Sequence, residues 1–146
     1  MANSLHILTE LRRLRGALAE PIDTFYAKNK SGGALAKGDV VVYDYADSTP
    51  ALYAVKSTTS AGDTAIAGMV YEAIAADKVG RIQRKGPTRS LKVNGTTDIA
   101  VGDRICSHTV AKVGAKSADG VGAFARALEV YAGDDSNGVI DAILEL

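Results

Sequence analysis

Cys106 and His108 are the residues of this chain whose types and spacing most invite a chemical function. On an extended strand, positions 106 and 108 point to the same side, so a thiol and an imidazole would face one site. A thiol nucleophile needs a third group to orient its histidine, and a structural metal site usually takes four ligands. Cys106 is the single cysteine, and the other histidine is His6. We therefore predict no catalytic residue, no metal and no cofactor, with Cys106 a buried or edge thiol beside a surface histidine.

The sequence GAKS at residues 114–117 resembles the end of a phosphate-binding loop. That loop requires Gly directly before the Lys and a second Gly five residues earlier. Ala115 and Val110 occupy those two positions, which excludes the motif. The adjacent carboxylates Asp134 and Asp135 lie in a stretch rich in Gly, Ser and Asn, which is typical of an exposed turn. The chain is therefore predicted not to be an enzyme.

Charge is balanced overall but unevenly distributed. The 17 Lys and Arg residues equal the 17 Asp and Glu residues, which argues against a general nucleic-acid binder. Residues 78–92 hold six Lys or Arg and no acid, whereas residues 129–146 hold five acids and no Lys or Arg. Either these are two solvated faces, or the segments meet, within one chain or between subunits. The basic run has no aromatic side chains on which bases would stack, so no nucleic-acid partner is expected.

The elements that position these residues begin with a predicted helix over residues 4–18. Ser4 is a suitable N-cap, and Pro21 stops the helix. Its apolar stripe consists of Leu5, Ile7, Leu8, Leu11, Leu14 and Leu18, and its polar side of Glu10, Arg12, Arg13 and Arg15. A helix this short is marginal alone, so the stripe must dock on its own domain, a sister subunit or a partner. No signal peptide and no membrane span are expected, because the arginines interrupt any long apolar run.

After Pro21 the pattern changes to short strands separated by glycine. Strands are predicted over residues 39–45, 51–56, 65–75, 79–85, 104–107, 110–113, 123–131 and 139–144. Asn94-Gly95 predicts a hairpin after the strand that ends at Val93, and Asn137-Gly138 predicts another tight turn. Many short strands at regular spacing favour a sandwich or a barrel. We predict a mainly β fold with a short N-terminal helix, divided into a helical arm at residues 1–26 and a β-rich domain at residues 27–146.

A faint internal repeat runs through the β-rich part. The segments at residues 36–40, 68–73 and 80–83 resemble those at 100–105, 125–130 and 138–141. Each unit would contain a Gly-Asp turn followed by strands, and two interlocked units would form one compact barrel-like core. Chance similarity in a chain rich in Gly and Val is the alternative.

The stretch from Ala27 to the C-terminus resembles the small phage capsid decoration (cement) proteins of the DUF2190 type. The segments that carry the resemblance are AKNKSGGALAKGDVVVYD, GMVYEAIAADKVGRIQRKG, LKVNGTTDIAVGDRICS and ARALEV, which begin at residues 27, 68, 91 and 125. The order of strands is also distantly similar to that of the phage lambda head-decoration protein. The N-terminal helix is not part of this resemblance.

The resemblance implies a β-tulip or barrel-like domain that assembles as a homotrimer on the capsid exterior of the virion, after synthesis in the host cytoplasm. Such a protein binds the major capsid protein and stabilises the bacteriophage head by bridging capsid subunits. We place the N-terminal helix as an anchor on the capsid or on a sister subunit, with packing on its own domain as the alternative. The candidate contact residues are Ile7, Leu11, Arg12, Arg13, Leu14, Arg15 and Leu18.

Two other classes of function fit a small β-rich chain less well. A receptor- or glycan-binding virion surface module usually presents exposed aromatic side chains as a sugar platform, whereas the six Tyr residues are scattered along this sequence. A small β-barrel enzyme is disfavoured by the single Cys and the two His residues.

Overall fold

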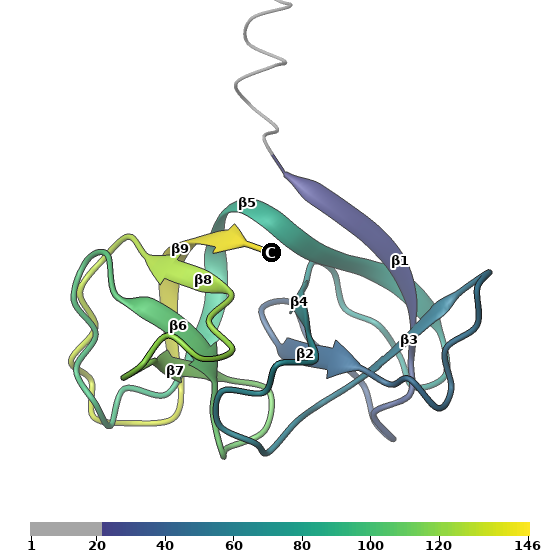
Figure 1. The fold of residues 1–146 in the computed structure, drawn as a ribbon, viewed down its shortest axis with the longest axis horizontal. Coiled ribbons are helices and arrows are strands. Elements are labelled where there is room, and N and C mark those ends of the chain that lie inside the picture. Colours follow the sequence, from purple (N-terminus) through teal and green to yellow (C-terminus); the bar gives the residue numbers. More distant parts are fainter. Residues whose placement is uncertain (1–21) are drawn as a thin grey trace, which may run out of the picture.

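The computed structural model describes residues 22–146, and this part of the chain consists of nine β-strands without a helix (Figure 1). The strands are β1 (Asp23–Asn29), β2 (Val40–Tyr43), β3 (Tyr53–Lys56), β4 (Ile66–Val70), β5 (Val79–Val93), β6 (Arg104–Ser107), β7 (Gly114–Lys116), β8 (Ala125–Ala127) and β9 (Gly138–Glu145). The mainly β prediction is confirmed. The helix predicted over residues 4–18 lies outside the described residues, and the predicted division between residues 26 and 27 falls inside β1.

Two details of the strand prediction are wrong. The strand predicted over residues 110–113 is loop, and β7 starts at Gly114. Asn94-Gly95 does not form a hairpin, because β5 pairs with β7 in parallel and with β9 from the far end of the chain. The buried Asn94 side chain instead makes a local turn, in which its Oδ1 accepts hydrogen bonds from the Thr96 N–H (3.0 Å) and the Thr96 hydroxyl (2.6 Å). Asparagine at a chain reversal favours this local bond as readily as a hairpin.

The nine strands close into two five-stranded barrels that share β5. Strands β1, β3, β2, β4 and β5 pair in a ring, which we call the first barrel. Strands β5, β7, β6, β8 and β9 pair in a second ring, the second barrel. Figure 1 shows the barrels side by side, with β5 passing from one to the other. The 15 residues of β5 are therefore the last strand of one barrel and the first strand of the next.

The shared strand turns sharply between the barrels. Gly86 has a φ of 96°, and the pairing of β5 with β9 shifts register between Thr88 and Leu91. The buried Gln83 amide donates hydrogen bonds to the carbonyl oxygens of the three residues at the turn, Lys85 (3.1 Å), Gly86 (3.2 Å) and Pro87 (3.0 Å). These three hydrogen bonds tie the buried amide to the backbone of the turn and stabilise it.

The two barrels are copies of one unit, as the faint sequence repeat predicted. Asp39 Oδ2 accepts a hydrogen bond from Ala36 N–H (2.8 Å), and Asp103 Oδ2 accepts one from Ala100 N–H at the same distance. The Asp39 carbonyl accepts a bond from Val70 N–H (2.8 Å), as the Asp103 carbonyl does from Ala127 N–H (2.9 Å). The first two pairs of repeated segments are thus confirmed as structurally equivalent.

The third repeated pair is shifted in register. Glu72 Oε1 accepts a bond from Arg81 N–H, and Glu129 Oε1 accepts one from Asp141 N–H. Arg81 therefore corresponds to Asp141, whereas the sequence repeat matches it with Val139. The segment from Glu129 to Asp141 is longer than that from Glu72 to Arg81, so the difference lies in the connection between β8 and β9.

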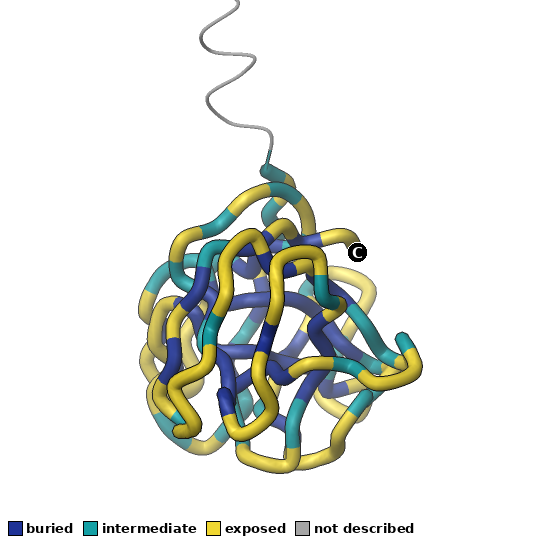
Figure 2. The backbone as a smooth tube through the Cα atoms, turned by 90° about the vertical axis from the view of Figure 1, so that its left-hand side faces the viewer, coloured by how far each residue is buried: buried dark blue, intermediate teal, exposed yellow. Residues whose placement is uncertain are grey.

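The prediction of one compact core is wrong, because the described residues form two hydrophobic clusters. The first cluster fills the first barrel and contains Ala27, Leu35, Val41, Val55, Ala67, Val70, Ile74 and Ile82. The second contains the interior of the second barrel, including Phe124 and Ile140, and also Val40 and Met69 from the other side of β2 and β4. Strands β2 and β4 are thus buried on both faces, and Figure 2 shows such buried segments running through the centre of the molecule.

The corresponding outer face of the second barrel is polar. Arg104 and Arg126 hold the positions that correspond to Val40 and Met69, and both arginines are exposed. The two barrels therefore differ in residue type at these equivalent positions, which are apolar and buried in the first barrel and charged and exposed in the second.

The equivalent turns make a matched test of how the barrels are joined. Gly38 (φ 93°) and Gly102 (φ 86°) have the same left-handed backbone, so Ala at either position costs about 1–2 kcal/mol. A Cβ at Gly38 would also overlap the carbonyl oxygen of Ser90 in β5, whereas a Cβ at Gly102 meets nothing within 4 Å. Gly38→Ala should therefore lower the free energy of unfolding by a further ~1–3 kcal/mol relative to Gly102→Ala. Urea unfolding of both variants measures this, and equal losses would contradict the described junction.

Candidate functional site

All seven residues predicted to contact the capsid or a sister subunit precede residue 22. Ile7, Leu11, Arg12, Arg13, Leu14, Arg15 and Leu18 therefore lie outside the described residues, and their contact role stays a prediction.

The structure places Cys106 in the interior and His108 in a turn. Cys106 is a buried free thiol, as predicted, with 7% of its surface exposed. His108 Nδ1 accepts a hydrogen bond from Val110 N–H (3.0 Å), which closes a local turn. Within residues 22–146, no group of three His, Cys, Asp or Glu side chains is placed to hold a metal ion. The same part of the chain has no helix long and apolar enough to cross a membrane.

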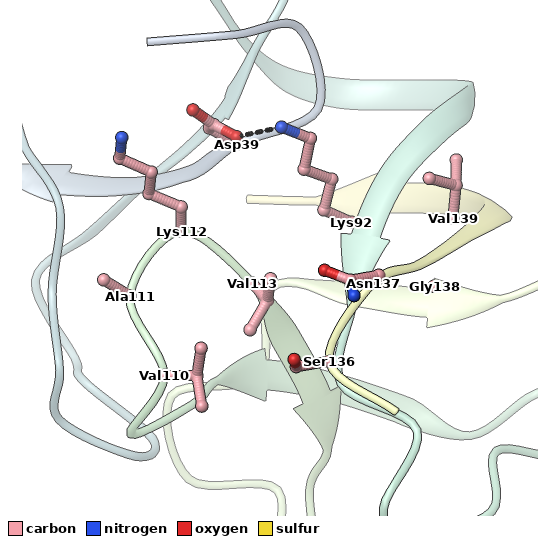
Figure 3. Close-up of a pocket in the computed structure, with 10 residues that line it drawn as sticks. All are labelled: Asp39, Lys92, Val110, Ala111, Lys112, Val113, Ser136, Asn137, Gly138 and Val139. Carbon is pink, nitrogen blue, oxygen red and sulfur yellow. Dashed lines mark hydrogen bonds and ion pairs between the residues drawn. The ribbon is translucent and has the colours of Figure 1, made fainter. Parts of the chain in front are cut away.

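A groove of about 300 Å³ lies where the two barrels meet (Figure 3). It is lined by Asp39, Lys92 and the loops at residues 110–113 and 136–139. Inside it, Lys92 Nζ lies 2.5 Å from Asp39 Oδ1, and Asp39 is almost fully buried. An ion pair in a groove can belong to a functional site, or it can be part of the fold.

The Gly-Asp turn that holds Asp39 belongs to the fold, because Asp103 closes the same turn in the second barrel. The lysine partners are not equivalent: Lys92 reaches Asp39 from β5, whereas Asp103 pairs with Lys116 of β7 (3.3 Å), and its turn lies outside the groove. The hydrogen bond from Ala100 N–H, followed by Lys116, holds the pKa of Asp103 below its ordinary value. Both aspartates therefore close a turn and pair with a lysine, and the Asp39–Lys92 pair links the two barrels at the groove.

Four aromatic side chains gather at one end of the first barrel. Phe25 of β1, Tyr43 and Tyr45 of β2 and the following loop, and Tyr53 of β3 form what we call the aromatic surface. Phe25 and Tyr43 pack against the first hydrophobic cluster. Tyr45 and Tyr53 are 71% and 52% exposed. The first barrel therefore closes its core with two aromatic rings and presents two more to solvent.

The fold itself does not require these rings. Asp44 N–H bonds to the Ala54 carbonyl, and His108 N–H bonds to the Val113 carbonyl in the same place of the second barrel. By this match, the positions of the second barrel that are equivalent to Tyr43, Tyr45 and Tyr53 are occupied by Ser107, Thr109 and Lys112. The second barrel closes without an aromatic residue at any of these three positions. The tyrosines are scattered in the sequence, and the one local indication of an aromatic surface is that residues 43 and 45 lie on the same side of a strand.

Two ion pairs lie beside the aromatic surface. Arg84 Nη2 lies 3.1 Å from Asp23 Oδ2, and Lys56 Nζ lies 3.7 Å from Asp44 Oδ1. The hydrogen bond to Asp23 is the main cause that raises the pKa of Arg84, and the Tyr43 hydroxyl adds to it. Each pair is neutral overall, so the aromatic surface has hydrogen-bonding groups beside it without a net charge.

Exposed aliphatic side chains gather on the second barrel. What we call the aliphatic surface consists of Val101, Leu128, Val130, Val139 and Ile143, which are 38% to 66% exposed. Hydrogen bonds from Gly102 N–H to the Ala127 carbonyl and from Leu128 N–H to the Asp141 carbonyl bring these segments together. In the first barrel, Lys37, Tyr71 and Ala73 occupy the positions that correspond to Val101, Leu128 and Val130. The fold therefore tolerates polar or small residues here, and an exposed apolar patch of this kind is typical of an interaction site.

The oppositely charged segments meet within the chain, which was one of the two alternatives. Strand β5 carries the basic run and pairs in antiparallel orientation with the acidic β9, so that Lys85 lies opposite Glu145. Glu145 also pairs with Arg126 of β8 (3.2 Å). The ion pairs of the basic run are made elsewhere: Arg81, Arg84 and Lys92 pair with Glu72, Asp23 and Asp39, which lie outside the acidic segment.

No protein-family model and no curated protein matches this sequence. Among solved structures, the chain is similar to the head fiber gp8.5 N base of bacteriophage phi29, with a TM-score of 0.57 and 13% sequence identity. The match covers 85% of this chain and 94% of that chain. A likeness at this identity establishes a shared fold.

The lowered pKa of Asp103 predicts a pH dependence of stability. A carboxylate whose pKa is lower in the folded state stabilises it above the unfolded value, near 3.8, and loses this effect as the pH falls through the folded value. The difference in unfolding free energy between the natural chain and Asp103→Ala should therefore be full above pH 4 and shrink below it. Thermal melts across this range test the prediction, and a constant difference would contradict it.

Proposed function

We propose that this chain is a bacteriophage virion protein that binds the outside of the assembled head and stabilises it by bridging major capsid subunits. The observation that carries the proposal is the fold shared with the N base of the phi29 head fiber, over 94% of that chain. The resemblance of residues 27–146 to capsid decoration proteins of the DUF2190 type supports the same role. Membership of that family stays a prediction.

The physical basis of such stabilisation is linkage. A protein that binds only the assembled shell lowers the free energy of that state relative to its separated subunits. Many copies, each with modest contacts, add their effects over the shell. This role needs exposed contact surfaces and no catalytic group, and the described residues offer two such surfaces.

We assign the aliphatic surface to contact between copies of this chain, in a homotrimer on the capsid exterior. Glu129 lies beside this surface and is exposed. The first barrel has Lys37 where the second has Val101, while Arg81 is paired with Glu72 of its own barrel (3.3 Å). One copy's second barrel can therefore meet a neighbour's first barrel with Glu129 facing Lys37, and a head-to-tail contact of this kind forms a ring when its rotation closes.

Substitution in the aliphatic surface tests the assigned contact. Val130→Asp should weaken self-association at least about tenfold, because it buries an unpaired carboxylate in the contact. Val121→Asp changes an exposed valine outside the aliphatic surface and serves as the matched control. Light scattering over a range of concentrations measures molar mass. An oligomer that survives Val130→Asp unchanged would contradict the assignment.

Removal of residues 1–20 tests the anchor. The truncated chain should keep its melting temperature, since β1 and both barrels remain, but it should co-sediment with empty capsids far less than the full chain. Normal co-sedimentation of the truncated chain would show that residues 1–20 are not the anchor.

A receptor- or glycan-binding module is the second candidate function. It gains support from the aromatic surface, because the tyrosines that are scattered in sequence lie together in the fold. Parallel binding measurements on empty capsids and on a glycan panel distinguish the two functions.

A further inference from the structure

We propose that the aromatic surface binds a neutral saccharide, independently of contact with the capsid. The candidate platform is formed by Tyr45 and Tyr53, with Phe25 and Tyr43 behind them. The proposal adds a ligand-binding activity to the capsid role and does not depend on it.

The ring geometry provides apolar planes of the right kind. Phe25, Tyr43 and Tyr45 form a stack with ring centroids 5.9 Å apart at each step and interplanar angles of 28° and 23°. Tyr53 stands edge-on to Phe25, at 5.7 Å and 90°, and inclined to Tyr43, at 5.5 Å and 63°. A pyranose ring presents a face of polarised C–H groups, which is attracted to the negative face of an aromatic ring. The rings beneath hold Tyr45 and Tyr53 in place, so little side-chain entropy is lost on binding.

The polar groups beside the rings suit sugar hydroxyls. The Arg84–Asp23 pair supplies N–H donors and a carboxylate acceptor at the edge of the surface, and Lys56 supplies a further donor, whereas its partner Asp44 is buried. Hydrogen bonds to charged groups are stronger than those between neutral groups. Because each pair has no net charge, the site favours a neutral sugar over an acidic one.

Other occupants fit this surface less well. A protein interface of ordinary size buries about 800 Å² per partner around an apolar centre, whereas only two exposed rings lie here between charged pairs. A platform for single-stranded nucleic acid combines stacking rings with a positively charged groove, and the flanking pairs provide no positive charge. The absence of aromatic residues at the matching positions Ser107, Thr109 and Lys112 shows that closing a barrel does not explain these tyrosines.

A panel of immobilised neutral and acidic oligosaccharides tests the proposal on the full chain. We expect binding to at least one neutral glycan, followed by titration of that soluble glycan into each variant. Tyr45→Ala and Tyr53→Ala should each weaken binding at least about tenfold, and Tyr45→Phe should retain it because the ring face remains. Tyr26→Ala is the matched control, since Tyr26 is 64% exposed on β1 but lies outside the aromatic surface.

Three results would overturn the proposal. One is the absence of binding to every glycan on the panel, and another is an equal loss in Tyr45→Ala and Tyr26→Ala. The third is loss of capsid co-sedimentation in Tyr45→Ala, which would assign the surface to the capsid instead. Co-sedimentation and molar mass of the natural chain are measured separately, so failure of the saccharide proposal is distinct from failure of the capsid role.

Discussion

The shared strand β5 is the constraint on which the rest of the structure depends. Its first half closes the first barrel through β1 and β4, and its second half closes the second barrel through β9 and β7. Neither ring of hydrogen bonds is complete without it. Closure matters because open sheet edges pair with other chains. The turn within β5 is therefore essential, and the buried Gln83 amide is its main polar support.

The duplication provides an internal comparison that separates fold from function. Features present in both barrels, such as the Gly-Asp turns, are what each unit needs to close. Features present in one barrel alone are not needed for closure. By this comparison the Asp39 turn beside the groove is structural, whereas the aromatic and aliphatic surfaces are additions to a common framework.

The two surfaces belong to different barrels and differ in chemistry. The aromatic surface combines ring faces with neutral ion pairs, which suits a small polar ligand. The aliphatic surface contains more exposed apolar side chains and has Glu129 beside it, which suits a protein partner. A chain that joins two such units can therefore present two separate surfaces of different chemistry.

The sequence by itself determined the class of fold, the strand-rich region and the repeated Gly-Asp turns. These features depend on local patterns, such as alternation along a strand and the backbone freedom of Gly38 and Gly102, which neighbouring residues reveal. Only the tertiary structure decided the partners of β5, the role of Asn94 and the gathering of Phe25 with three tyrosines. Strand pairing between distant segments depends on how whole strands bury their faces, and no local pattern encodes it. The functional surfaces therefore came from the fold, although every residue in them was visible in the sequence.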